Sequence, residues 1–223
     1  MQDQNQIYFP PEWYPQSGIQ LTWPHKWTDW APLLREVIPC FVSIAHAIMK
    51  RENLLIVCRN KKEVEQQLGW YDPRRVRFIE IETNDTWARD HGGITVLTPE
   101  GPKVYDFTFN GWGMKFPAGL DNLITRKLFY RQAFAEGVKY ENMAPFVLEG
   151  GSIETDGQGT LLTTKRCLRS FNRNDHLSPE VLERSLKNLF GVERILWLHN
   201  GYLAGDDTDG HIDTLARFCQ EDT

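Results

Sequence analysis

One stretch of the chain concentrates side chains that could do chemistry. Residues 205–213, with the sequence GDDTDGHID, hold four aspartates around a single histidine, His211. They follow an apolar run, 195–198, that is typical of a buried strand. Carboxylates at this density repel one another, so a bound cation or a proton-transfer reaction is needed to explain them. The pattern therefore predicts a metal ion, a cationic substrate, or catalysis by a histidine flanked by acids.

Acidic residues close to glycine recur along the chain at nearly equal spacing. Asp90, Glu149 and Asp209 each lie within two residues of a glycine, and they are separated by 59 and 60 residues. Equal spacing indicates one supersecondary unit used repeatedly, each copy delivering a polar side chain to the same end of the fold. We therefore expect Asp90, Glu149, His211 and Asp213 to surround one centre.

This set of side chains suits a guanidinium group. A guanidinium is a planar fork of donors that stays protonated, with a pKa above ~12. Two carboxylates grip its edges through charge-assisted hydrogen bonds. A histidine beside them transfers protons, while a third acid fixes its tautomer.

The elements that must position these residues follow an α/β pattern, in which short apolar strands alternate with amphipathic helices. Helices are expected at 30–51, 63–68 and 121–134, and another begins at Ser178, which caps it ahead of Pro179. Strands are expected at 54–58, 76–81, 94–97, 104–107, 146–148, 152–155, 160–164 and 195–198.

The overall composition excludes several classes of function. Hydrophobic residues make up 41% of the 223, and 8 Trp among them provide for a packed core. The net charge of −5 disfavours nucleic acid as a partner and favours a cationic one. No leader segment and no membrane span are evident, so the sequence predicts a cytoplasmic protein. The 4 Cys, far apart in apolar surroundings, are expected to be small buried hydrophobes rather than zinc ligands or disulfide partners.

Five segments, in order, resemble the agmatine deiminases and the related bacterial peptidylarginine deiminases of the pentein, guanidine-modifying superfamily. They are PEW at 11–13 with LTWPH at 21–25, NDTWARD at 84–90, FNGWG at 109–113, LEGGS at 148–152, and the 205–213 stretch continuing to LARF at 215–218. The resemblance covers nearly the whole chain. It implies a single domain, 1–223, in a pentein-type α/β propeller of repeated strand-helix-strand modules around a central site.

The same resemblance implies a role for each residue. Asp90 and Asp213 correspond to the acids that grip the substrate guanidinium, and Glu149 to the acid that supports the catalytic histidine, His211. A cysteine thiolate attacks the guanidinium carbon to give a covalent thiouronium intermediate. Agmatine is thereby hydrolysed to N-carbamoylputrescine and ammonia, a step of putrescine and polyamine biosynthesis, with no metal or other cofactor.

The cysteine nucleophile is where this chain departs from the family pattern. Family members carry it in a glycine-rich segment well beyond the histidine, whereas this chain ends at Thr223. A strand is expected at 211–219, and along it Cys219 would lie ~26 Å from His211, too far to attack a shared carbon. We therefore expect a truncated family member with about three and a half of five modules, inactive alone. Its uncovered strand edges are expected to favour self-association or a homo-oligomer.

The residues that bind the far end of the substrate are predicted on weaker grounds. The 109–115 segment resembles the agmatine branch, and agmatine carries a second cation there. Asp207 and the faces of Trp87 and Trp112 suit that cation, as do Asp206 and Asp209. In the alternative interpretation the aspartates cap turns and both tryptophans belong to the core.

Three other functions stay open at this level. Peptidylarginine deiminase activity, which would citrullinate proteins, fits the same resemblance. A metal-dependent hydrolase using Asp207, Asp209, His211 and Asp213 is consistent with the residues alone and predicts inhibition by a chelator. A non-enzymatic, guanidinium-binding pseudoenzyme is the third.

Overall fold

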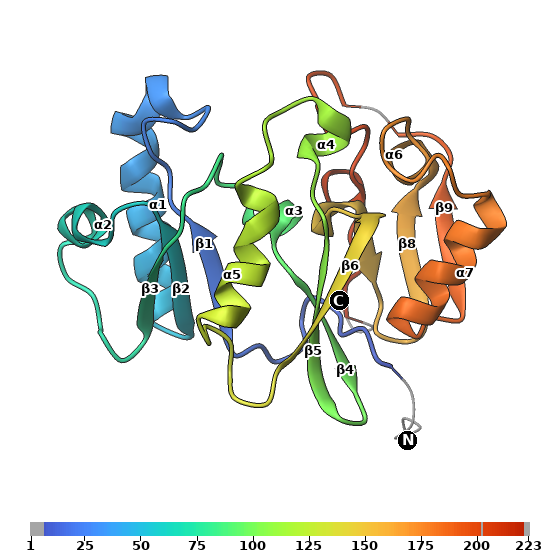
Figure 1. Ribbon diagram of the computed structural model, residues 1–223, viewed down its shortest axis with the longest axis horizontal. Coiled ribbons are helices and arrows are strands. Elements are labelled where there is room, and N and C mark those ends of the chain that lie inside the picture. Colours follow the sequence, from blue (N-terminus) through green and yellow to red (C-terminus); the bar gives the residue numbers. More distant parts are fainter. Residues whose placement is uncertain (1–6, 202, 221–223) are drawn as a thin grey trace. The chain divides into compact units, whose positions relative to one another are not determined.

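The structure, a computed structural model, describes residues 7–201 and 203–220 and divides into two compact units (Figure 1). We call one the parallel-sheet unit, which comprises Pro15–Ala88 and Gly119–Ala135. The other, the hairpin unit, comprises Met1–Tyr14, Arg89–Ala118 and Glu136–Thr223. The α/β class expected from the sequence is confirmed.

The parallel-sheet unit is built on one three-stranded sheet. Its strands, all parallel and in spatial order β1-β2-β3, are β1 Gly18–Thr22, β2 Asn53–Cys58 and β3 Val76–Glu80. Its helical elements are η1 Ala31–Leu33, α1 Leu34–Met49, α2 Lys61–Leu68, η2 Asp121–Leu123 and α5 Ile124–Tyr130. Both α2 and the predicted helix 63–68 end at Leu68, where Gly69 follows with a positive φ of 66°.

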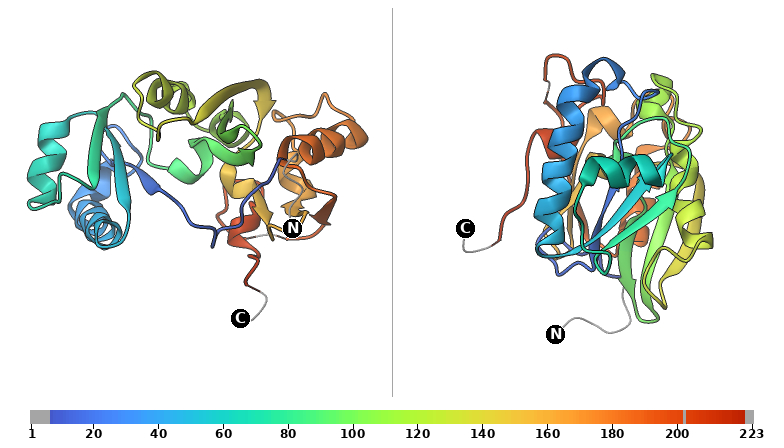
Figure 2. Two further views of the ribbon diagram at one scale, coloured as in Figure 1. Left: turned by 90° about the horizontal axis from the view of Figure 1, so that it is seen from below. Right: turned by 90° about the vertical axis from the view of Figure 1, so that its left-hand side faces the viewer.

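Alternation along β2 explains why this sheet is covered on both faces. Leu54 and Ile56 belong to the apolar cluster that includes Ala45 and Met49 of α1 and Val64 of α2. Figure 2 shows α1 and α2 together on one side of these strands. Val57, between Ile56 and Cys58 of the same cluster, packs instead with Ile124 and Leu128 of α5. Successive side chains of a strand point to opposite faces, so one apolar run serves both layers.

The hairpin unit repeats one motif twice. In each sheet two antiparallel strands form a hairpin, and the third strand pairs in parallel with the second. The first sheet is β4 Ile94–Thr98, β5 Gly101–Thr108 and β6 Lys139–Val147; the second is β7 Ile153–Thr155, β8 Thr160–Thr164 and β9 Arg194–Leu198. The helical elements are α3 Ala88–His91, which begins at the unit boundary, α4 Gly111–Met114, η3 Gly150–Ser152, α6 Lys165–Leu168, α7 Pro179–Phe190 and η4 Ile212–Thr214.

Helix α7 packs its apolar face against the core of the hairpin unit. The Ser178 side chain accepts a hydrogen bond from the Val181 amide, and Gly191 ends the helix in the left-handed region. Leu182, Leu186 and Phe190, four residues apart on one face, are fully buried beside β8 and β9 (Figure 1). This core fixes the strands whose ends carry the candidate site.

Two sequence expectations about elements were wrong. Strand β6 begins at Lys139, seven residues before the predicted start, because its first half is polar and little buried and so lacks an apolar pattern. The strand predicted at 211–219 does not exist: Leu215 and Ala216 donate backbone hydrogen bonds to Ile212, which closes the helical turn η4. The ~26 Å spacing argued for Cys219 therefore does not apply.

One helix differs from the expectation that no segment is apolar enough to span a membrane. Ala31–Met49 passes a test of length and composition, with a mean hydropathy of 1.4. Core helices and signal segments pass the same test, so this is weak evidence for a membrane span. The expectation that no leader is present concerns residues 1–6, which lie outside the described part of the chain.

Candidate active site

Asp90, on the short helix α3, is the first of the predicted residues and is 8% exposed. Its Oδ1 accepts a hydrogen bond from the Gly151 amide at 3.0 Å, and its Oδ2 accepts one from Trp112 Nε1 at 3.1 Å. Burial raises the pKa of this carboxyl above its ordinary value, and the nearby His211 and the two hydrogen bonds offset only part of that rise. The carboxylate is therefore held in a fixed orientation by backbone and indole donors.

Gly151 is the point around which the predicted residues converge. A Cβ at this position would lie 2.6 Å from His211 Nδ1 and 2.7 Å from both Asp213 Oδ2 and Asp90 Oδ1. Only glycine leaves room for three functional side chains at one point of the backbone. Glycine at 151 comes directly after the Glu149-Gly150 pair, so the sequence motif and this close approach are the same feature.

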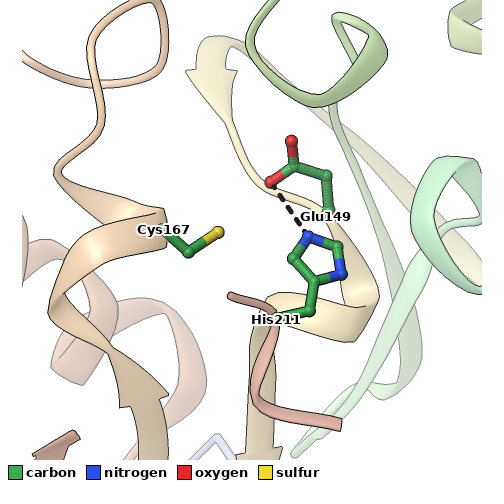
Figure 3. A group of neighbouring side chains, drawn as sticks. All are labelled: Glu149, Cys167 and His211. Carbon is green, nitrogen blue, oxygen red and sulfur yellow. Dashed lines mark ion pairs between the residues drawn. The ribbon is translucent and has the colours of Figure 1, made fainter. Parts of the chain in front are cut away.

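Glu149 and His211 face each other in the interior (Figure 3). Glu149 follows the end of β6 and is fully buried, and His211, which precedes η4, is 1% exposed. Glu149 Oε2 lies 3.9 Å from His211 Nε2, while His211 Nδ1 lies 3.5 Å from Asp90 Oδ1. The imidazole is thus flanked by a carboxylate on each side.

The acids around His211 decide its charge. Burial lowers the pKa of this imidazole, but Cys167, Glu149 and Asp90 outweigh burial and raise the pKa to about 11. A cationic His211 can donate a proton at neutral pH. Within the described part of the chain, His211 Nε2 and Asp213 Oδ1 are buried and have no hydrogen-bond partner. Buried polar atoms without a partner are rare in folded proteins and often belong to catalytic sites.

Arg173, which the sequence analysis did not single out, holds Glu149 in place. Its Nε donates to both carboxylate oxygens of Glu149 at 3.0 Å, and both side chains are fully buried. Burial raises the pKa of Glu149, but His211 and Arg173 outweigh burial and lower the pKa overall. No sequence motif points to Arg173, because this residue lies 24 positions from Glu149 in a polar loop.

Hydrogen bonds to the backbone hold the segments before Glu149 and before His211 in position. Asn174 donates to the Val147 carbonyl and accepts from the Val147 amide, which continues the bonding of β6 toward Glu149. The Thr164 hydroxyl, at the end of β8, donates to the Gly210 carbonyl at 2.6 Å. The loop residue just before His211 is therefore hydrogen-bonded to the end of a core strand.

Cys167 lies beside Glu149 and His211, and the sequence analysis did not identify it as a site residue. Its thiol, on α6, points toward the side chains of Glu149 and His211 (Figure 3), and the ligand-type atoms of the three residues lie within 4.8 Å of one another. Burial raises the pKa of the Cys167 thiol. The expectation of buried cysteines holds for Cys58 and Cys167 but is wrong for Cys40 and Cys219, which are exposed.

This trio has donor types that zinc binds, but its charge environment argues against a metal. The ligand-type atoms of the three residues lie within 4.8 Å of one another, so distance alone does not decide whether they hold an ion. The Arg173 guanidinium already neutralises Glu149, and a second cation beside it would be repelled. Among the described residues, the quartet proposed for a metal-dependent hydrolase, Asp207, Asp209, His211 and Asp213, forms no such group.

The predicted tail-binding residues fall in different environments. Trp112 is buried and bonded to Asp90, and its φ of 55° is left-handed. Asp207 is exposed, and its carbonyl accepts a hydrogen bond from Lys115. Trp87 belongs to the parallel-sheet unit, where its ring lies 6.0 Å from that of Trp30.

Of two neighbouring aspartates, Asp206 is engaged as the alternative interpretation expected and Asp209 is not. The Asp206 carboxylate accepts hydrogen bonds from the amides of Thr208 and Gly210, so it caps the turn. The Asp209 carboxylate pairs with Arg173 and Lys115.

Comparison with known proteins identifies relatives along nearly the whole chain. The model of the Porphyromonas-type peptidyl-arginine deiminase family matches residues 8–223. An agmatine deiminase of Ectopseudomonas mendocina is 36% identical over 219 residues, covering 96% of this chain and 57% of the relative. One of Pseudomonas aeruginosa is 37% identical over 216 residues, covering 94% and 56%. The chain thus spans little more than half the length of these curated relatives.

Solved structures show the same fold. A Porphyromonas gingivalis protein, provisionally called an arginine deiminase, is 56% identical with a TM-score of 0.89, covering 96% of this chain and 63% of its own. A cysteine-to-serine variant of C. jejuni agmatine deiminase, solved with substrate bound, is 40% identical with a TM-score of 0.87, covering 95% and 62%.

Proposed function

Because the chain belongs to the Porphyromonas-type peptidyl-arginine deiminase family, we propose that it supplies the guanidinium site of an enzyme that hydrolyses agmatine to N-carbamoylputrescine and ammonia. The observation that carries the proposal is the convergence of Asp90 and Asp213 on Gly151, beside His211. This reaction belongs to putrescine biosynthesis. No cofactor enters it.

The three carboxylates of the site outnumber its two cations. Asp90, Asp213 and Glu149 face Arg173 and His211, so when ionised the cluster keeps a net negative charge that a guanidinium neutralises. Asp90 is already bonded through both oxygens, which fixes its plane. Asp213 Oδ1 is the buried acceptor left for the ligand within the described residues.

His211 acts as the proton donor and acceptor. A cysteine thiolate forms a bond to the guanidinium carbon, His211 gives its proton to a departing amino group, and ammonia leaves. Neutral His211 then takes a proton from water, which attacks the thiouronium carbon, and the thiolate departs to leave the ureido product. Glu149 stabilises the imidazolium that forms between the steps.

The thiolate does not come from Cys167 in this proposal, although Cys167 is the thiol next to His211. A nucleophilic cysteine needs access and a lowered pKa. Cys167 is completely buried and its pKa is raised by burial. The substrate-bound C. jejuni relative carries a cysteine-to-serine change, as a cysteine nucleophile predicts for that protein. In keeping with the sequence-based expectation of a chain that is inactive alone, we expect the 223 residues to bind agmatine without hydrolysing it.

Two assays on the purified chain test this proposal. Titration with agmatine should change tryptophan fluorescence, because Trp112 contacts Asp90. Asp213→Asn should weaken that response, and a chelator should leave it unchanged. Ammonia release should be absent in the chain and in Cys167→Ala and Cys219→Ala. Rapid release that depends on either cysteine would refute the assignment of the nucleophile, and a missing response in the wild-type chain would refute agmatine binding.

A peptidylarginine substrate is the second candidate, favoured by the description of the matching family. Both substrates present the same guanidinium, so the site around Gly151 serves either. They differ at the far end, where agmatine has an amine and a peptide has neutral amides. Competition between agmatine and a blocked arginine peptide shows which of the two ligands the site prefers. A guanidinium-binding pseudoenzyme would differ from both enzymes, because the complete protein would bind one of these ligands without reacting with it.

A further inference from the structure

Arg173 is a buried cation that bonds Glu149, Ser170 and the loop that precedes His211. Its Nε donates to Glu149, and its NH1 group donates to Asp209 Oδ2 at 2.6 Å and to the Ser170 hydroxyl. Its NH2 group donates to the Thr208 carbonyl at 3.0 Å. One guanidinium plane thereby ties the end of β6 to the loop that leads into His211.

These bonds belong to a longer run of alternating charges. Lys115 Nζ lies 2.7 Å from Asp209 Oδ1 and also donates to the Asp207 carbonyl at 2.7 Å. Cations and anions therefore alternate from Lys115 through Asp209 and Arg173 to Glu149. Lys115 follows the α4 segment, whose Trp112 holds Asp90. The run thus connects three of the segments that build the site.

The loop at Asp209 depends on these partners. Asp209 has a φ of 67°, a left-handed conformation that a residue with a side chain seldom adopts unless its surroundings hold it there. Its carboxylate is gripped on one oxygen by Arg173 and on the other by Lys115. His211 follows two residues later, so the backbone conformation of Asp209 determines the position of the His211 side chain.

We propose that Arg173 is the positioning residue of this site, a buried fork that aligns Glu149 and the 206–211 loop so that Glu149 faces His211. Arg173 does not touch the substrate guanidinium in this scheme. A lysine would not replace it fully, because a single ammonium cannot reproduce a fork that bonds a carboxylate, a second carboxylate and a carbonyl together. Only the consequence for agmatine binding rests on the proposed function.

The decisive consequence is the ionisation of Glu149. With Arg173 present, its influence and that of His211 keep the pKa of this buried carboxyl below its ordinary value. Without the arginine, burial is opposed by His211 alone, and the proton affinity of Glu149 should rise by about 100-fold. A purely structural arginine would change the unfolding temperature but would not raise this affinity selectively.

The test follows the carboxyl carbon of Glu149 by NMR during a pH titration, with Glu149→Gln used to assign its signal. Arg173→Met should shift the titration upward by that factor, and Arg173→Lys should shift it less. Arg194→Met is the matched control, since Arg194 bonds only the Thr160 hydroxyl among the described side chains and should leave Glu149 unchanged. A Glu149 titration that is the same in Arg173→Met and in the wild type overturns the proposal. If Arg173→Met does not fold, Arg173→Lys decides by the same criterion.

Agmatine binding provides the second readout. Protonated Glu149 no longer offsets the imidazolium, so Arg173→Met should lose affinity more strongly at pH 5 than at pH 8, a pH dependence absent from Arg194→Met. If the wild-type chain itself binds no agmatine, the proposed function fails while the Glu149 titration still decides the role of Arg173.

Discussion

Replacing Gly151 by alanine tests the geometry at the centre of the site. The added methyl carbon would lie 2.6 Å from His211 Nδ1 and 2.7 Å from an oxygen of Asp90 and of Asp213. Ordinary contact begins at 3.4 Å, so each of these atoms must retreat by about 0.7 Å. Because Gly151 does not have a positive φ, alanine meets no backbone strain, and the whole effect comes from the crowded side chains.

The expected magnitude follows from that displacement. Misplacement of reacting groups on the scale of 1 Å lowers rates by about 100-fold. We expect a comparable, about 100-fold loss of agmatine affinity, equal to ~2.7 kcal/mol. Overpacking should also lower the free energy of unfolding by ~1–3 kcal/mol.

Affinity is measured by tryptophan fluorescence during agmatine titration, and stability by urea unfolding. Gly119→Ala is the matched control, since a Cβ there meets nothing within 4 Å and the residue has an ordinary φ, so both quantities should stay unchanged. Agmatine affinity in Gly151→Ala within about threefold of the wild type would refute the convergence of the two acids and the histidine on this point.

Three further predictions concern charge and packing. Asp213→Asn should weaken agmatine binding by about 10- to 100-fold in fluorescence titrations, since a hydrogen bond to a charged group contributes ~1.5–3 kcal/mol. The pKa of His211 is raised from 6.5 to about 11, so its stabilisation is fully present below pH 6.5 and is lost as the pH rises to about 11. The melting temperature should therefore fall across that window, and less so in His211→Gln. Phe190→Ala, in the core, should lower the free energy of unfolding by ~3–5 kcal/mol in urea, whereas the exposed Phe171→Ala should not change it.

Residues close in sequence were the ones that sequence patterns could predict. Helix α7 carries its stop and start signals within 14 residues, from Ser178 to Gly191, and its apolar face follows a helical period. Strand β2 was visible because its side chains are apolar on both faces. Strand β6 was mostly invisible, because its first half is polar and its pairing depends on β5 rather than on its own burial.

The predicted site residues divide in the same way. The Glu149-Gly150-Gly151 motif and the His211-x-Asp213 pair identified side chains that the structure brings together at Gly151. Trp112 was named as a partner for the substrate tail, yet it bonds the Asp90 carboxylate. That contact depends on four consecutive left-handed residues, 111–114, a conformation that no periodicity predicts.

The acids and the histidine that could act on a guanidinium were identifiable from short motifs, because such motifs specify residue types and the sharp turns that present them. Which of those charges are already neutralised became visible only in the folded chain. Arg173, 24 residues from Glu149, pairs with Glu149 and with Asp209, and Cys167 lies beside His211. Burial and pairing set the free energy of a charge, and both depend on segments that meet only once the sheets have formed.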